Sequence, residues 1–197
     1  MPTRKLKTPQ DNVEWLNELL DCLNLERVPL VGHSNGCWQI LNLAKSTPQR
    51  VERTVLLSPG PPFAQLRWQM MARLLPVFIR PTRGMFYWNL QWLTTVPLDK
   101  DQPNTLIEQF MIGAMSFKPE ELGMGLQSIF TDDLRQINIP TLLLTGDQER
   151  VINPGKVLKR ARLMPNIEAE VIENAGHLMP VDQADAVNAR MLRFLPA

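Results

Sequence analysis

The stretch that decides the fold is Val28-Pro29-Leu30-Val31-Gly32-His33-Ser34-Asn35-Gly36. It begins as a short apolar run, ends in the pattern Gly-x-Ser-x-Gly, and is followed at 37–44 by residues typical of a helix. The two flanking glycines allow a strained turn from strand to helix that no larger side chain would permit, with Ser34 at its apex. Such a turn lifts the hydroxyl clear of the sheet and places the amide of Asn35 at the helix N-terminus, where negative charge is stabilised. The pattern also occurs in ordinary surface turns, so its interpretation depends on the rest of the chain.

The composition is that of a globular domain with a full hydrophobic core. Of 197 residues, 44% are hydrophobic and 21% are charged, and the formal net charge of +1 gives no electrostatic case for binding nucleic acid or an anionic membrane. Two cysteines, Cys22 and Cys37, and two histidines support neither a disulfide scaffold nor a zinc site. No apolar run reaches the length of about 20 residues that spans a bilayer, and no signal-type apolar core follows the start. We therefore expect a cytoplasmic protein without a metal or a membrane span.

Alternation of strand and helix patterns predicts an α/β fold. Thr8-Pro9-Gln10-Asp11 combines a capping hydroxyl, a proline and an acidic first turn, which predicts a helix start. The all-apolar character of 28–33 fits a parallel strand that is covered on both faces. A helix between the first two strands indicates a right-handed βαβ unit, and we predict a mostly parallel sheet of about four strands flanked by helices. The elements that we expect are helices over 9–24 and 183–195 and strands over 28–33, 51–57, 139–145 and 168–172.

Helical spacing dominates between the second and third predicted strands, and prolines break this segment into pieces. Its apolar residues, including most of the methionines and Trp68, Trp88 and Trp92, have two interpretations. They pack helices together, or they form a mobile apolar lid over a pocket, and we retain both. The predicted division is an α/β core at 1–60 and 136–197 with a helical cap insertion at 61–135. Three stripes at helical spacing support the helices: Leu66, Met70, Leu74 and Leu75; Phe86, Leu90 and Leu93; Leu106, Phe110, Met111 and Met115.

Polar groups follow three of the predicted strands directly. They are Ser34, the acidic pair Asp147 and Glu149, and His177. Because the carboxyl ends of parallel strands lie along one edge of a sheet, residues far apart in sequence meet there. A serine hydroxyl needs a base to become a nucleophile, a neutral imidazole is suited to that task, and a carboxylate fixes the imidazole tautomer. The order serine, acid, histidine is the one that belongs to a strand-to-helix nucleophile turn.

From Thr8 onward the chain resembles the α/β-hydrolase family. The matching pieces are 32–36 at the nucleophile turn, 140–152 at the acid turn and Asn174-Ala175-Gly176-His177 before the last helix. The resemblance implies Ser34 as nucleophile, His177 as general base and acid, and a carboxylate as third member. It implies no cofactor and no metal, and the segment from Pro59 to Ile139 looks like the variable helical cap of the family.

The third member has two candidates. In the family's usual acid turn the carboxylate lies three residues after the glycine that ends the strand, which is Glu149 in this chain, and we favour it. Asp147 is the alternative if the turn is shorter, and the acid that is not used is expected to be a solvated turn residue. We expect His33 to be a packed or hydrogen-bonded core histidine and Cys37 to be a small buried residue rather than a second nucleophile.

Members of the family normally carry further strands before this turn, together with a loop that supplies a second oxyanion donor. If the chain starts at Met1, the strand 28–33 is expected at a sheet edge, where it is a template for a homodimer. The first hypothesis is a carboxylesterase-type serine hydrolase that cleaves a small, largely apolar ester through an acyl-enzyme, with the Asn35 amide in the oxyanion hole. The alternative is a truncated, weakly active or non-catalytic domain that serves as an oligomeric binding module.

Overall fold

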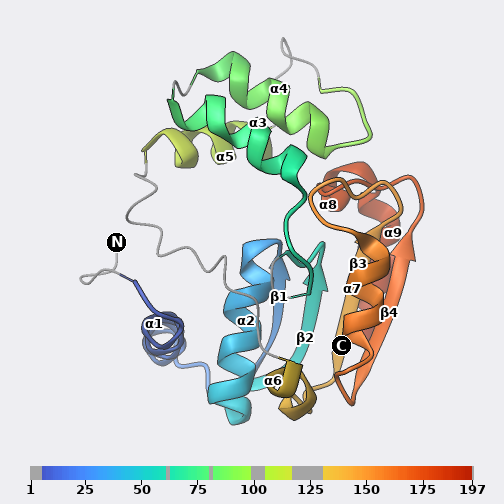
Figure 1. Ribbon diagram of the computed structural model, residues 1–197. Coiled ribbons are helices and arrows are strands. Elements are labelled where there is room, and N and C mark those ends of the chain that lie inside the picture. Colours follow the sequence, from blue (N-terminus) through green and yellow to red (C-terminus); the bar gives the residue numbers. More distant parts are fainter. Residues whose placement is uncertain (1–5, 61–62, 80–81, 99–104, 117–130, 197) are drawn as a thin grey trace.

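The computed structural model describes residues 6–60, 63–79, 82–98, 105–116 and 131–196 (Figure 1). Four strands alternate with helices, and a run of helices separates the second strand from the third. The strands and helices, in chain order, are α1 (Pro9–Cys22), β1 (Val28–His33), α2 (Asn35–Ser46), η1 (Pro48–Arg50), β2 (Val51–Leu57), α3 (Trp68–Ile79), α4 (Arg83–Leu93), α5 (Thr105–Ser116), α6 (Thr131–Gln136), β3 (Thr141–Gly146), α7 (Pro154–Ala161), β4 (Ile167–Ile172), α8 (Met179–Asp182) and α9 (Ala184–Phe194).

The four strands form one sheet in the order β1-β2-β3-β4, and each neighbouring pair is parallel. The register places Gly32 beside Leu56 and Leu56 beside Leu143, so the strands end near one another. The predicted α/β class and the parallel sheet of four strands flanked by helices are confirmed. Since the strands run the same way, the residues that follow each of them gather at one edge of the sheet.

Alternate residues of the two central strands enter different apolar clusters. Leu56 and Leu143 pack in the cluster that contains α2 and α7, whereas Val55 and Leu142 pack in the cluster that contains α9. All four side chains are fully buried. The helices therefore cover both faces of the sheet at β2 and β3, which is why these strands read as continuous apolar runs.

Strand β1 differs from this pattern, because it lies at an edge of the described sheet. Pro29 is exposed and Val31 is 48% exposed, while Val28 and Leu30 pack against the main cluster. The expectation that this strand is covered on both faces is wrong for the described residues. Both faces of β1 carry apolar residues, but only one face is buried. Periodicity in the sequence cannot tell a buried face from an exposed face when both are apolar.

Helix α1 begins where its start signals place it. Thr8 accepts a hydrogen bond from the amide of Asp11, and Asp11 in turn accepts from the amide of Thr8, which completes a capping box in front of Pro9. The helix ends at Cys22, two residues before the predicted end, and packs against α2. This capping pattern was readable from sequence because all its partners lie within four positions of one another.

Helices α3, α4 and α5 gather beyond one end of the sheet, as Figure 1 shows. Within this group, Phe86, Leu90 and Leu93 are buried as expected, but Trp68 is 75% and Trp88 49% exposed. Packing between helices therefore accounts for only part of the apolar content of the segment. The predicted cap also includes residues 61–62, 80–81, 99–104 and 117–130, which lie outside the described residues.

Helix α6 lies elsewhere, although it falls within the segment predicted as a cap. It sits near the end of α2, and Lys45 Nζ and Asp133 Oδ1 form an ion pair at 2.8 Å. Its Leu134 is fully buried in the main cluster. The division into core and cap stays a prediction, and α6 is the part of 61–135 that packs with the sheet.

None of the helices in the described ranges is long and apolar enough to cross a membrane. Both cysteines are free thiols, Cys22 exposed and Cys37 buried. In the same parts of the chain no group of three or more histidine, cysteine, aspartate or glutamate side chains is arranged to hold a metal ion.

The turn from β1 to α2 has one indispensable glycine rather than two. A Cβ at Gly32 would lie 2.7 Å from the backbone carbon of Gly36 and 2.7 Å from Ile40 Cδ1. A Cβ at Gly36 would meet nothing within 4 Å. Neither glycine needs a positive φ, whereas Ser34 itself adopts φ 52° and ψ −112°. The close approach of strand and helix therefore needs glycine at one position, and the backbone strain lies at the serine.

We predict that Gly32→Ala lowers the free energy of unfolding by about 1 to 3 kcal/mol, because backbone must move to admit the methyl group. Gly36→Ala is the matched control and should change that free energy by less than about 1 kcal/mol, since the site is open and alanine suits a helix. Urea unfolding followed by circular dichroism measures both. Equal losses in the two variants would contradict the assignment of the close contact to Gly32.

Candidate active site

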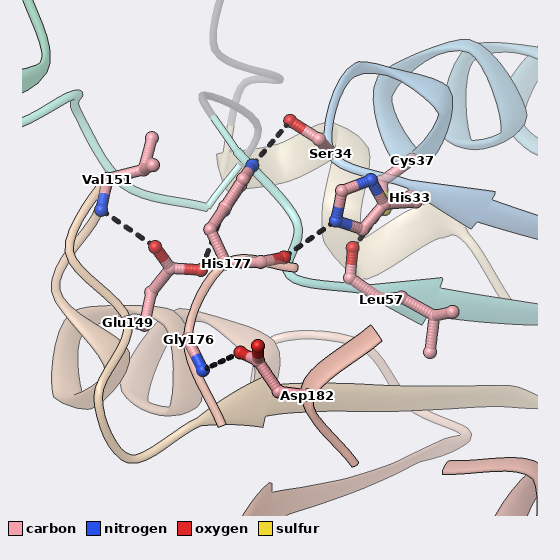
Figure 2. Close-up of polar contacts among 9 residues, drawn as sticks. All are labelled: His33, Ser34, Cys37, Leu57, Glu149, Val151, Gly176, His177 and Asp182. Atoms are coloured by element: carbon pink, nitrogen blue, oxygen red, sulfur yellow. Dashed lines mark hydrogen bonds and ion pairs between the residues drawn. The ribbon is translucent and has the colours of Figure 1, made fainter. Parts of the chain in front are cut away.

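Ser34 occupies the apex between β1 and α2. Its positive φ is unusual for a residue with a side chain, and its hydroxyl makes no capping bond to the helix that it precedes. The hydroxyl instead lies 3.0 Å from Nε2 of His177 (Figure 2). The turn therefore aims the oxygen away from the helix and at an imidazole 143 positions later in the chain.

His177 lies on the loop that follows β4 and is 5% exposed. Its Nδ1 lies 2.8 Å from Oε2 of Glu149, and the two groups are buried together. A carboxylate can only accept, so the proton of a neutral imidazole resides on Nδ1 and Nε2 is left to accept from the hydroxyl of Ser34. The geometry thus selects the tautomer in which the histidine can take a proton from the serine.

Glu149 is held by the turn that follows β3. It is 3% exposed, and its Oε1 accepts a hydrogen bond from the amide of Val151 at 2.7 Å. Burial alone would raise the pKa of this carboxyl, but the hydrogen bond and charge of His177 and the amide of Val151 outweigh burial and hold the pKa below its usual value. The carboxylate therefore stays ionised beside the imidazole.

Asp147, the alternative acid, points elsewhere. It is exposed, and its Oδ1 accepts from the amide of Ala175 at 3.1 Å. The two loops meet closely here, because a Cβ at Gly146 would lie only 2.0 Å from the carbonyl oxygen of Ala175. The carboxylate that contacts His177 is thus that of Glu149, three residues after this glycine.

His33 directly precedes the serine and contacts the backbone of His177. Its Nε2 donates to the backbone carbonyl of His177 at 2.7 Å, and the centroids of the two rings are 5.1 Å apart. Burial, together with the charge of His177, lowers the pKa of His33 to about 4. His33 is therefore a neutral, hydrogen-bonded histidine near neutral pH.

Cys37 is not a second nucleophile. Its thiol is fully buried and donates to the carbonyl of Gly32 at 3.1 Å. Burial raises the pKa of this thiol, so it carries its proton at neutral pH. The group thus ties the first turn of α2 to the end of β1.

Two further residues of this region were not identified from sequence. Asp182 lies at the end of α8 and is 8% exposed, and its carboxylate contacts the amide of Gly176 and the hydroxyl of Thr94. An aspartate five positions after a histidine carries no pattern of its own. Only the fold brings it to Thr94, 88 positions away.

A hollow of about 330 Å³ between α3 and α4 lies apart from these groups. Inside it the guanidinium of Arg73 lies 4.0 Å from the ring centroid of Trp88 and 4.9 Å from that of Trp92. Its lining includes none of Ser34, Glu149 and His177. The lining residues are Arg73, Tyr87, Trp88, Gln91, Trp92 and Leu98.

Comparison with known proteins identifies similar chains. A curated carboxylesterase of Bacillus subtilis (strain 168), YbfK, is 31% identical over 205 residues, which cover 99% of this chain and 66% of the relative. An uncharacterised carboxylesterase of the same organism, nap, is also 31% identical, over 100% of this chain and 66% of its own length. The chain therefore spans just under two thirds of these relatives.

Solved structures agree with this similarity. The crystal structure of carboxylesterase CesB (YbfK) from Bacillus subtilis superposes with a TM-score of 0.84 at 27% identity, and covers 98% of this chain and 68% of its own. That of naproxen esterase (carboxylesterase NP) from Bacillus subtilis gives a TM-score of 0.85 at 28% identity, with the same coverage. A profile described as the alpha/beta hydrolase fold matches residues 10–184, a span that includes Ser34, Glu149 and His177. With its parallel sheet and this match over most of its length, the chain belongs to the alpha/beta hydrolase fold family.

Proposed function

We propose that the protein is a serine hydrolase that cleaves a small, largely apolar carboxylic ester through an acyl-enzyme. The observation that carries the proposal is the line of contacts from Ser34 Oγ through the His177 imidazole to Glu149, at 3.0 Å and 2.8 Å. The similarity to carboxylesterases over nearly the whole chain supports the same reaction class.

In the first half of the reaction Ser34 Oγ attacks the ester carbonyl carbon. His177 Nε2 takes the hydroxyl proton as the new carbon–oxygen bond forms, and a tetrahedral intermediate results. The ionised Glu149 stabilises the imidazolium through its bond to Nδ1. The imidazolium then gives its proton to the alcohol oxygen, the bond from the carbonyl carbon to that oxygen breaks, and Ser34 is left acylated.

In the second half water replaces the serine. His177 takes a proton from the water as its oxygen attacks the acyl carbon, and the same proton returns to Ser34 Oγ as the acyl–serine bond breaks. The products are a carboxylic acid and the free enzyme. Each half uses the imidazole once as base and once as acid, which requires the ring orientation that Glu149 and His33 hold.

The negative charge of each tetrahedral intermediate needs hydrogen-bond donors. We assign one donor to the backbone amide of Asn35, the first residue of α2. The helix N-terminus adds a positive end of its dipole at the same place. This assignment follows from the position of Asn35 directly after the nucleophile.

The helices α3, α4 and α5 are proposed as a cap over the reacting groups. The end of α4 reaches the loop of the histidine, because the amide of Leu178 donates to the carbonyl of Leu93 at 3.1 Å. Apolar side chains are abundant in this group of helices, which supports an apolar acyl or alcohol group on the substrate.

The proposal is tested with an alkyl fluorophosphonate probe. The probe should label the intact protein on Ser34, because an activated serine attacks the phosphorus and displaces fluoride. Ser34→Ala should not be labelled and should not hydrolyse short-chain aryl esters, as mass spectrometry and a colorimetric assay will show. A folded protein that resists labelling, or a Ser34→Ala variant that is labelled equally, would refute the assignment of Ser34 as the nucleophile.

Substitutions distinguish the roles of the two acidic residues, Glu149 and Asp147. Glu149→Gln keeps the size of the side chain but favours the wrong histidine tautomer, and kcat should fall by about 10⁴-fold. Asp147→Asn is the control, and its kcat should stay within about threefold because a single exposed loop contact contributes little. If Asp147→Asn lost the activity and Glu149→Gln kept it, the assignment of the acid would be wrong.

The pH profile provides a further test. His177 must be neutral to accept a proton, so kcat/KM should be lower at acid pH than near neutral pH. The pKa of His33 is lowered to about 4 and that of Glu149 is lowered from its usual value, so between pH 5 and 8 both keep their charge states. In this range His33 and Glu149 should therefore add no ionisation of their own, and the profile of His33→Gln should have the same shape as that of the wild type. A second ionisation that disappears in His33→Gln would contradict this account.

A further inference from the structure

Two carboxylates accept hydrogen bonds from consecutive amides of the loop that carries His177. Asp147 Oδ1 accepts from Ala175 N at 3.1 Å. Asp182 Oδ2 accepts from Gly176 N at 2.7 Å (Figure 2). Bonds to charged acceptors are stronger than bonds between neutral groups. The surroundings of the two carboxylates differ, because Asp147 is exposed and Asp182 is 8% exposed.

Asp182 also binds a second segment of the chain with its other oxygen. Oδ1 accepts from the hydroxyl of Thr94 and from the amide of Thr95, the latter at 3.0 Å. Thr94 directly follows the last residue of α4 and is itself buried. One buried carboxylate thus joins the end of α4 to the amide that precedes His177.

The two segments also touch backbone to backbone. The amide of Leu178 donates to the carbonyl of Leu93 at 3.1 Å, and the hydroxyl of Thr95 donates to the carbonyl of Asn174 at 2.8 Å. A Cβ at Gly176 would lie 2.6 Å from the carbonyl oxygen of Leu93. The approach is therefore too close to admit a side chain at position 176 unless the backbone shifts.

Gly176 and Leu178 flank His177, and each is bonded outside the loop. The first is held by Asp182, and the second by Leu93. Since both flanks depend on the segment 93–95, a shift of this segment would rotate or translate the imidazole relative to Ser34.

We propose that Asp182 is a positioning residue that makes the placement of His177 depend on the end of α4. Its carboxylate holds Gly176 with one oxygen and Thr94 and Thr95 with the other. The kinetic consequence of this proposal rests on the serine hydrolase function proposed above, whereas its structural consequence does not. The helices that would cover the substrate are thereby coupled to the base that activates the nucleophile.

The kinetic test compares Asp182→Ala with Asp147→Ala, because each variant removes one carboxylate from the same loop. For Asp182→Ala the rate of fluorophosphonate labelling and kcat on a short-chain aryl ester should fall by about 10- to 100-fold with KM changed far less, as expected for a misplaced base. Asp147→Ala should stay within about threefold of the wild type. Equal effects of the two substitutions would overturn the proposal.

Two substitutions of Thr94 provide a second comparison, and both leave the carboxylate of Asp182 in place. Thr94→Val keeps the shape of the side chain but removes the hydroxyl that reaches Asp182, so labelling should slow in the same direction. Thr94→Ser restores the hydroxyl and should restore the rate. If valine and serine behaved alike, or if only the free energy of unfolding changed, the coupling would be refuted.

A third measurement does not need turnover. The proton between His177 Nδ1 and Glu149 should give a low-field proton resonance in the wild type. The resonance should persist in Asp147→Ala and Thr94→Ser, and should shift or broaden in Asp182→Ala, Asp182→Asn and Thr94→Val. If the fluorophosphonate probe did not label the wild-type protein, the serine hydrolase proposal would fail. If the resonance stayed unchanged in all Asp182 and Thr94 variants, the positioning role of Asp182 would fail independently of that result.

Discussion

The contact between Ser34 and His177 depends on a serine held at a positive φ between a strand and a helix. That conformation is unfavourable for a residue with a side chain, and it persists because the surrounding backbone leaves no alternative. Strand β1 and helix α2 approach so closely that a Cβ at Gly32 would lie 2.7 Å from the backbone of Gly36. The packing of α2 on the sheet therefore restrains the turn and keeps the hydroxyl of Ser34 directed at the imidazole of His177.

The histidine presents a different problem, because it lies on a loop without a regular hydrogen-bond ladder. Separate groups replace that ladder: His33 holds the carbonyl of His177, and the buried Asp182 holds the amide of Gly176. The exposed Asp147 adds a weaker bond to the amide of Ala175. Glu149 then orients the ring itself. In the reaction proposed above the imidazole exchanges protons in two directions, and a small displacement from the serine would cost much of the rate.

Much of this arrangement could be predicted from sequence, and the errors have physical causes. The four strands and the start of α1 were predictable because apolar runs and capping partners are local. The coverage of β1 was predicted wrongly, since an apolar face looks the same in sequence whether a helix covers it or not. The need for glycine was assigned to both flanks of Ser34, but the approach of Ile40 restricts only Gly32. Distances between elements are not encoded in the pattern of one element.

The sequence by itself predicted the candidate reacting groups, because a serine between glycines, an acid turn and a late histidine each follow a predicted strand. It left Glu149 and Asp147 as alternatives and said nothing of Asp182. Tertiary structure decided these points: parallel strand ends bring the three loops to one edge, and the loop of His177 turns its Nδ1 to Glu149 while Asp147 binds the backbone. Asp182 meets Thr94 only because the end of α4 lies beside that loop. The reason is general, since residue type follows from local sequence, whereas hydrogen-bond partners 88 positions apart follow from packing.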